Sequence, residues 1–140
     1  VVGDARLGLV ALGSALAGHR APPDWADRAQ AARRAWDLYV AGNVAPENRP
    51  NSYAQAIGVV NALCHPRDRV VAAAGGLPAE VTANWRTLGI GTVDVEFGFS
   101  CMGYEIAGGW GARIAQSQVE PDRDTIVFVG DGSYLLMNAD

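Results

Sequence analysis

The feature that most constrains this chain is a repeated alternation of short apolar runs and helix-compatible segments in its second half. Apolar runs of strand length occupy residues 70–74 and 125–129, and residues 92–96 form a third segment that we interpret as a strand. Helix-compatible segments at residues 78–85 and 103–116 separate these runs. Strands that alternate with helices are typical of a parallel sheet covered by helices on both faces. The sequence therefore predicts an α/β fold, in which ligands bind beyond the carboxyl ends of the strands.

The chain before this alternation is organised differently. Residues 1–20 contain one apolar, helix-compatible stretch that ends at Gly18, and we interpret them as the end of a central domain. Residues 21–50 combine several prolines with one helical stretch rich in Ala and Arg. That composition is typical of a linker that carries a surface helix. Residues 51–140 then form the domain that contains the sheet.

The start of this third domain carries a helix-start signal. Ser52, followed three residues later by Gln55, matches a capping box. The ends of the chain carry no comparable signals, because residue 1 is not Met and residues 135–140 break off in a segment of helical composition. We therefore expect a fragment that is truncated at its C-terminus and is inactive when expressed alone.

Charge and composition exclude several classes of function. A net charge of -4 and a pI near 5.0 provide no basic surface of the kind that binds nucleic acid. Cys64 and Cys101 lie far apart, with only two histidines in the chain, so neither a disulfide framework nor a zinc site is indicated. No apolar run approaches the roughly 18 residues of a membrane span, and the first residues lack the basic region of a signal peptide. We expect a cytoplasmic protein without a nucleic-acid or membrane partner.

The segment Gly130-Asp131-Gly132-Ser133 directly follows the last apolar run. A carboxylate at the end of a buried parallel strand can reach a hard cation such as Mg²⁺. The glycines allow backbone N–H groups to approach phosphate oxygens closely. The segment therefore predicts a site for magnesium and a diphosphate, with a simple strand-terminating turn as the alternative.

The segment Gly75-Gly76-Leu77-Pro78 stands at another junction between strand and helix. Free N–H groups at the start of a helix, with the helix dipole behind them, favour an anion such as a diphosphate. Two glycines in this place also make an ordinary tight turn, and that alternative stays open. Glu80 opposes an anion, so a phosphate site here requires its side chain to point away.

A third segment, residues 96–105, combines aromatic, small and thioether residues in a loop before a helix. Such a loop can enclose a flat ring, with Met102 as an adaptable apolar wedge. Composition alone favours a different structure, in which the loop packs into the core. It also favours Cys101 as a buried small hydrophobe over a nucleophile, because no histidine lies near it in sequence.

The helix expected after Met102 carries two stripes. Small residues recur every four positions, and large apolar residues form a second stripe beside them. The two stripes are Gly103, Ala107, Gly111 and Ala115, and Ile106, Trp110 and Ile114. The small stripe permits close backbone approach, either to the rest of this chain or to another subunit.

In their order and spacing, the three segments resemble the cofactor-binding C-terminal domain of thiamine-diphosphate enzymes related to acetohydroxyacid synthase. The resemblance implies that Asp131 binds the Mg²⁺ that holds the diphosphate, with a further Asn beyond residue 140. Ser100-Cys101-Met102-Gly103 stands where that family has Gly-Thr-Met-Gly. The carbonyl of Ser100 then receives the 4′-amino group of the aminopyrimidine, and Met102 keeps the cofactor bent. The implied cofactor-binding residues are Gly75, Gly76, Leu77, Ser100, Cys101, Met102, Gly130, Gly132 and Ser133.

Residues 48–55 and 96–108 resemble one branch of this family, the 3D-(3,5/4)-trihydroxycyclohexane-1,2-dione hydrolases. Synthases usually continue as Gly-x-Gly-Leu-Pro-Ala-Ala where this chain has Gly-Tyr-Glu-Ile-Ala-Gly-Gly. The resemblance implies hydrolysis of a carbon–carbon bond in a cyclic dione, giving 5-deoxy-glucuronate in myo-inositol breakdown. In the family an activating Glu belongs to the N-terminal domain of the partner subunit. A homo-oligomer that acts on a small-molecule substrate is therefore implied, with no catalytic residue in this chain.

Two other functions are compatible with the same residues. One is a different thiamine-diphosphate enzyme, either like acetohydroxyacid synthase or a decarboxylase of 2-oxo acids. The other is a non-catalytic phosphate-binding α/β domain, in which Gly-Asp-Gly is only a turn.

Overall fold

The structure is a computed structural model that describes residues 3–45, 52–137 and 139. The chain forms two compact units, Val1–Asp37 and Leu38–Asp140. In the part of the chain that is described, no helix combines the length and apolarity needed to cross a membrane. Residues 48–51, which contribute to the hydrolase resemblance, lie outside the described residues, as do residues 138 and 140. The division into three domains stays a prediction.

The first unit contains a capped helix and most of a second one. α1 (Ala5–Ala15) follows Asp4, whose Oδ1 accepts a hydrogen bond from the backbone N–H of Leu7 at 2.8 Å. α2 (Trp25–Val44) begins in this unit and ends in the second. Exposed ion pairs one turn apart on or beside α2, such as Arg33 with Asp37, add only a little helix stability. Helices are thus present where the composition of residues 1–20 and 21–50 predicts them.

The second unit begins its sheet region with α3 (Tyr53–Leu63), and the predicted capping box is confirmed. The Ser52 hydroxyl accepts a hydrogen bond from the Gln55 N–H at 3.2 Å, and the Gln55 side-chain oxygen accepts one from the Ser52 N–H at 3.0 Å. The Gln55 amide also donates to the carbonyl of Ala45 at 2.8 Å, which ties the end of α2 to the start of α3.

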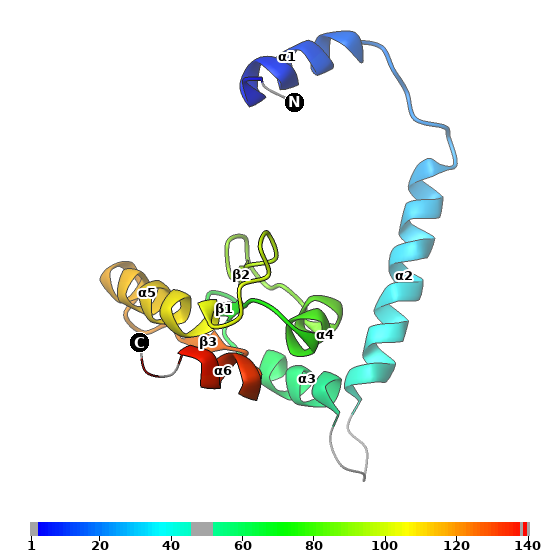
Figure 1. Ribbon diagram of the computed structural model, residues 1–140. Coiled ribbons are helices and arrows are strands. Elements are labelled where there is room, and N and C mark those ends of the chain that lie inside the picture. The colour runs from blue at the N-terminus through cyan, green and yellow to red at the C-terminus, as the bar shows by residue number, and fades with distance from the viewer. Residues whose placement is uncertain (1–2, 46–51, 138, 140) are drawn as a thin grey trace. The chain divides into compact units, whose positions relative to one another are not determined.

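The three strands form one parallel sheet in the order β2-β1-β3 (Figure 1). They are β1 (Arg69–Ala72), β2 (Val93–Val95) and β3 (Thr125–Val127). Val70 of β1 stands opposite Val93 on one side and Ile126 on the other. Each strand is shorter than the segment that predicts it. Backbone pairing nevertheless continues past β3, where the Phe128 N–H donates to the carbonyl of Val71 at 2.9 Å.

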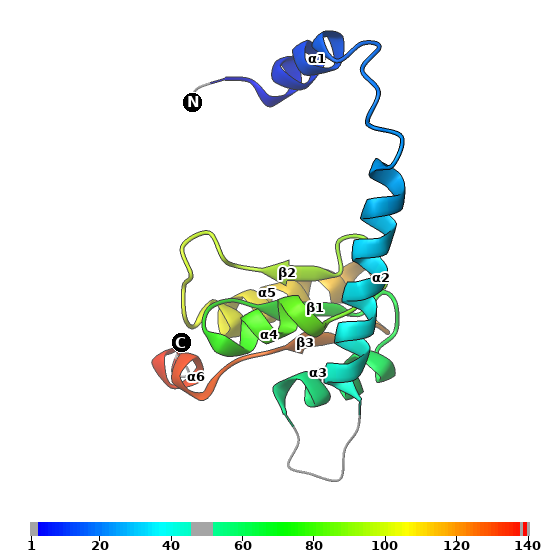
Figure 2. The ribbon, with the colours of Figure 1, turned by 90° about the vertical axis from the view of Figure 1, so that its right-hand side faces the viewer.

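Helices cover both faces of the sheet, which confirms the predicted fold class (Figure 2). α3 and α4 (Gly76–Asn84) cover one face, where Ile57, Val70 and Val81 are fully buried. Ile126 and Phe128 pack against this cluster. α5 (Tyr104–Val119) packs on β1 and β3 from the other side. α6 (Asp131–Met137) follows β3 and packs on α5.

Neither predicted stripe is the face that α5 turns toward the sheet. The buried residues of α5 are Glu105, Gly109 and Gln116. A Cβ at Gly109 would lie 2.5 Å from Cγ2 of Val127, so this glycine allows the close helix–sheet contact. The interpretation of the small stripe as intrachain packing is therefore wrong for its helical part, since Ala107, Gly111 and Ala115 are exposed. A subunit interface stays a prediction.

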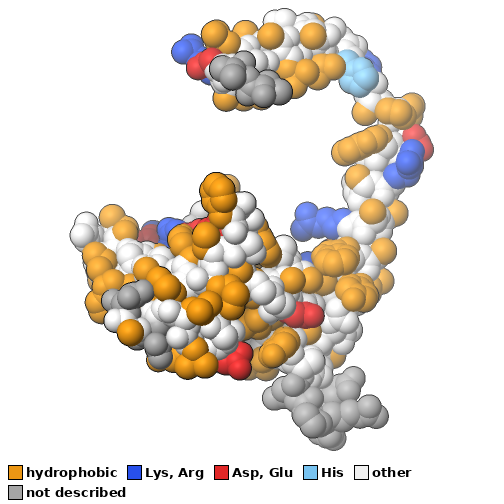
Figure 3. Space-filling model, viewed as in Figure 1, with side chains coloured by type: hydrophobic (Ala, Val, Ile, Leu, Met, Phe, Trp, Pro, Cys, Tyr) orange, Lys and Arg blue, Asp and Glu red, His pale blue; other side chains and the backbone are white. Residues whose placement is uncertain are grey.

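The large apolar stripe also faces outward. Trp110 is 72% exposed, and Ile114 is exposed as well. Leu135 and Leu136 add to this exposed surface, and Figure 3 shows hydrophobic side chains gathered over the region of α5 and α6. Helical periodicity predicts that these residues share a face, but the contact with Val127 requires the face that carries Gly109 to meet the sheet.

Candidate functional site

The three predicted site segments all follow strands at the same edge of the sheet. The turn at Gly75 follows β1, the loop 96–103 follows β2, and the segment beginning at Gly130 follows β3. Because the strands are parallel, their carboxyl ends meet at one edge. In Figure 2 the loop 96–103 and α6 lie at the same end of the sheet. Segments far apart in the sequence therefore lie where a ligand of an α/β sheet is expected.

The turn after β1 leaves backbone donors open at the start of α4. Gly75 has a φ of 101°, in the region that favours glycine, and no side chain caps the helix. A Cβ at Gly75 or Gly76 would meet nothing within 4 Å, so both glycines border open space. The side chain of Leu77 packs against the core, which leaves its backbone as the part that can face an anion.

Glu80 does not compete for this helix start. Its carboxylate accepts a hydrogen bond from the side-chain amide of Asn84, one turn further along α4, at 2.9 Å. The condition that the sequence set for a phosphate site at Gly75 and Gly76 is thus met.

The loop after β2 is organised by the carboxylate of its first residue, Glu96. The Glu96 side chain accepts hydrogen bonds from the backbone N–H of Phe99 and of Cys101, each at 2.9 Å. These bonds, that of Cys101 first, lower the pKa of Glu96, because they favour its charged form. Within this turn Ser100 has a φ of 55°, the left-handed region that glycine adopts more readily. Ser100 thus has a backbone conformation that suits glycine, at the position where the thiamine-diphosphate enzymes that this chain resembles have Gly.

The same loop is exposed, so the expectation of a core-packed loop is wrong. Phe99 is 90% exposed and Met102 is 46% exposed. Cys101 is exposed too, which corrects its interpretation as a buried small hydrophobe. The hydrogen bonds to Glu96 hold the loop at the sheet edge, where its apolar side chains face outward. An apolar wedge such as Met102 is therefore accessible to a ring.

In its described residues, the segment after β3 presents an exposed carboxylate, that of Asp131. Asp131 is exposed at the start of α6, and its Oδ1 accepts a hydrogen bond from the Gly132 N–H at 2.9 Å. A Cβ at Gly130 would meet nothing within 4 Å. Among the described residues, no group of three or more His, Cys, Asp or Glu side chains gathers to hold a metal. A cation at Asp131 would thus need ligands beyond such a cluster, as Mg²⁺ does when it binds phosphates and water.

A buried carboxylate outside the residues that the sequence motifs predict as functional joins two of these segments. Oε2 of Glu105 accepts a hydrogen bond from the Gly103 N–H at 2.9 Å and another from the Ser133 hydroxyl at 2.8 Å. The Gly103 N–H also lies 2.6 Å from the Ser133 hydroxyl oxygen. The sequence gives little signal for this role, because an acidic residue in the first turn of a helix is common and the partner Ser133 lies 28 residues away.

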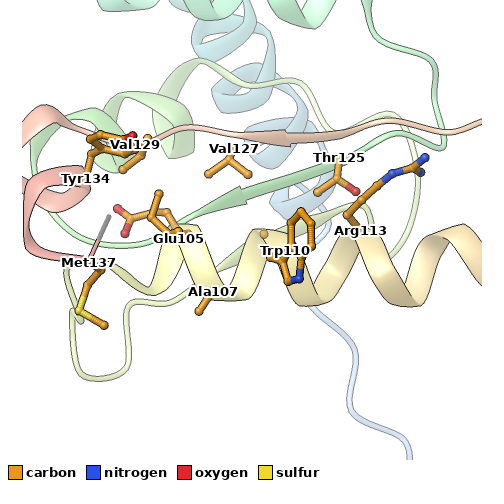
Figure 4. Close-up of a pocket in the computed structure, with 11 residues that line it drawn as sticks. Glu105, Ala107, Trp110, Arg113, Thr125, Val127, Val129, Tyr134 and Met137 are labelled. Carbon is orange, nitrogen blue, oxygen red and sulfur yellow. The ribbon is translucent and has the colours of Figure 1, made fainter. Parts of the chain in front are cut away.

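A groove of about 640 Å³ lies elsewhere, between α5, β3 and α6 (Figure 4). Its lining is mainly apolar and includes Trp110, Val127 and Tyr134, with Glu105 at one end and Arg113 at the other. None of the cofactor-binding or metal-binding residues that the sequence predicts lines this groove. The candidate site is instead the open edge of the sheet, because strand order and chain direction gather its donors there.

A protein family and several known proteins resemble part of this chain. Residues 73–140 match the family model of the thiamine pyrophosphate enzyme, C-terminal TPP binding domain. A 3D-(3,5/4)-trihydroxycyclohexane-1,2-dione hydrolase of Geobacillus thermodenitrificans (strain NG80-2) is 40% identical over 84 residues, which cover 60% of this chain and 12% of that protein. The hydrolase of the same name from Clostridium botulinum (strain Eklund 17B / Type B) is 36% identical over 85 residues, which cover 61% of this chain and 13% of that protein.

These matches confirm the resemblance drawn from the three segments. The aligned part spans about an eighth of the length of these relatives. The family match over residues 73–140 includes the turn after β1, the loop after β2 and the segment after β3, which meet at the sheet edge. Over residues 73–140 the chain therefore resembles the C-terminal TPP-binding domain of the thiamine pyrophosphate enzymes.

Proposed function

We propose that this chain supplies the cofactor-binding edge of a thiamine-diphosphate-dependent hydrolase. Its substrate is 3D-(3,5/4)-trihydroxycyclohexane-1,2-dione, and the reaction opens a carbon–carbon bond to give 5-deoxy-glucuronate in myo-inositol degradation. The observation that carries the proposal is the meeting of the three segments at the carboxyl edge of one parallel sheet. The names of the matched hydrolases support the choice of substrate.

The residues at this edge fit the diphosphate end of the cofactor. Open space at Gly75, Gly76 and Gly130 lets backbone N–H groups approach phosphate oxygens. Asp131 supplies an exposed carboxylate as a ligand for Mg²⁺. Gly132 and Ser133 follow Asp131, and we include them among the residues that bind the diphosphate. At the turn after β1, Leu77 contributes only its backbone, because its side chain packs against the core.

The loop after β2 fits the ring end of the cofactor. Ser100 has a left-handed backbone conformation. We propose that its backbone carbonyl accepts a hydrogen bond from the 4′-amino group of the aminopyrimidine. Met102 offers an exposed apolar side chain to hold the ring, and Cys101 anchors the loop between them. When bound, the cofactor supplies carbanion stabilisation, while these residues bind and orient it. We assign no general acid or base within this chain and infer that a partner subunit of a homo-oligomer provides one.

We place this enzyme in the cytosol. Both cysteines are free thiols, Cys64 half-buried and Cys101 exposed, and exposed thiols persist in a reducing compartment.

The test uses the intact protein and measures both binding and turnover. Calorimetry should show thiamine-diphosphate binding that requires Mg²⁺, and the cyclic dione should be consumed only when both are present. A protein that binds the cofactor but turns over 2-oxo acids instead is a synthase or decarboxylase. A folded protein without any magnesium-dependent cofactor binding would be a phosphate-binding domain at most, and the proposal would fail.

A further inference from the structure

Glu105 carries the one buried carboxylate among the described residues. Its side chain is 0% exposed, although Glu is rarely buried without partners. Both hydrogen bonds fall on Oε2, while Oε1 is buried and has no partner in the part of the chain that is described. A buried carboxylate destabilises a protein unless its bonds offset the loss of hydration, so a residue kept in this position is expected to have a specific role.

The two donors to Glu105 come from the two segments assigned to opposite ends of the cofactor. Gly103 closes the loop that carries Ser100 and Met102, and it is buried. Ser133 is 3% exposed and lies two residues after Asp131. Figure 4 shows the Glu105 carboxylate pointing from α5 toward α6. One oxygen atom thus links the ring side of the edge to its metal side.

The packing around this link leaves little freedom. A Cβ at Gly132 would lie 3.7 Å from the terminal methyl of Met102, so the two segments are in van der Waals reach. A Cβ at Gly103 would overlap the side chain of Met137 in α6. Gly103 has a φ of 96°, which also favours glycine at this position. The loop after β2 and the start of α6 therefore approach each other at one place, where the Glu105 carboxylate bonds to both.

We propose that Glu105 is a positioning residue that fixes Met102 relative to Asp131, and so sets the distance between the ring-binding and metal-binding parts of the site. The inference rests on the proposed function. A carboxylate oxygen can accept the N–H and the O–H together, whereas an aliphatic side chain can accept neither. Side chains that orient metal ligands from a second layer change affinity about 10–100-fold when they are removed.

The test separates position from charge with two conservative variants of the intact protein. Glu105→Gln keeps the length and one acceptor oxygen but removes the charge. Glu105→Asp keeps the charge but shortens the side chain by one methylene, so that it no longer reaches both donors. Positioning predicts that Glu105→Gln binds thiamine diphosphate and Mg²⁺ close to wild type, and that Glu105→Asp binds about 10-fold or more weakly by calorimetry.

The matched control is Glu120, which ends the same helix and pairs with Arg67. Glu120→Gln and Glu120→Asp should leave cofactor affinity unchanged. Thermal unfolding of each variant without cofactor shows whether a change in affinity merely follows a loss of stability. Because both Glu105 substitutions are small and polar, we expect both variants to fold.

Three results would overturn the inference. Equal cofactor affinity in Glu105→Asp and wild type would show that the link is not needed. Weak binding by Glu105→Gln with normal binding by Glu105→Asp would assign the role to charge. A fall in unfolding temperature for Glu105→Asp with unchanged affinity would make the role structural. A wild-type protein that binds no cofactor at all would instead remove the proposed function, and the inference with it.

Discussion

Two carboxylates hold the loop after β2. Glu96 lies at its exposed part, residues 96–102, which we call the rim, and Glu105 lies at its buried end. Glu96 accepts two backbone bonds at the rim, where water and salt screen its charge. Glu105 accepts its two bonds where no water reaches it, at the junction with α6. Bonds of similar length therefore differ in consequence, because the loss of a buried acceptor leaves donors unsatisfied, whereas water replaces an exposed one. In the proposed site, the buried end holds the loop in place and the exposed rim presents side chains to the cofactor.

The largest effect is expected at Asp131, the exposed carboxylate that follows the buried junction. We expect Asp131→Ala in the intact protein to abolish magnesium-dependent binding of thiamine diphosphate. Among the described residues, no cluster of His, Cys, Asp or Glu side chains could bind the Mg²⁺ in its place. Calorimetry with and without Mg²⁺ measures the loss. Asp122→Ala is the matched control, since Asp122 is also exposed but precedes β3 at the other end of the strand. Near-normal affinity in folded Asp131→Ala would disprove the metal assignment.

The next effect separates two exposed neighbours in the loop. Met102→Ala should lower turnover by about 100-fold if Met102 holds the reactive geometry of the cofactor. Cys101→Ala should change turnover far less, because the hydrogen bond to Glu96 from the backbone N–H of Cys101 remains. Steady-state kinetics of both variants, at saturating cofactor, checks the difference. An equally severe loss of turnover in Cys101→Ala would show that Met102 has no special role in holding the cofactor.

A smaller effect compares a buried and an exposed glycine on α5. Gly109→Ala places a Cβ 2.5 Å from Cγ2 of Val127, and we expect a loss of about 1–3 kcal/mol in unfolding free energy. Gly111→Ala meets nothing within 4 Å and should stabilise the protein by up to about 1 kcal/mol, because Ala favours a helix. Denaturant unfolding of the two variants measures both. If Gly111→Ala is as destabilising as Gly109→Ala, the exposed stripe is covered in the intact protein, as a subunit interface requires.

The smallest effect concerns the pH dependence of the rim. The pKa of Glu96 is lowered in the folded loop, so the bonds to Phe99 and Cys101 stabilise the loop fully above the ordinary value of 4.5. That stabilisation is lost as the pH falls below 4.5 and through the lowered pKa. The amide chemical shifts of Phe99 and Cys101 should titrate in this acidic range. Glu96→Gln should remove the titration, and a titration that persists in this variant would assign it to another group.

The alternation of strand and helix segments was sufficient to predict a parallel sheet and the edge at which three sequence segments meet. The runs at residues 70–74 and 125–129 carry their own signal, because a strand buried on both faces of a sheet is apolar throughout. The capping box at Ser52 is equally local, since both partners lie within four residues. The segments at Gly75, Ser100 and Asp131 could be assigned to one edge because parallel strands all end on the same side.

What the sequence alone determined about this protein is thus the order of its elements, its fold class and the resemblance carried by three short segments. Only the tertiary structure decided which face of α5 meets the sheet, because periodicity groups Trp110 with Ile114 without stating what they face. It also decided that Cys101 is exposed, because the Glu96 carboxylate binds the backbone N–H of Cys101 and holds the loop at the surface. The link from Glu105 to Ser133 depends on a contact between residues 28 apart. Such a contact exists only once two strands and a helix have brought both ends together.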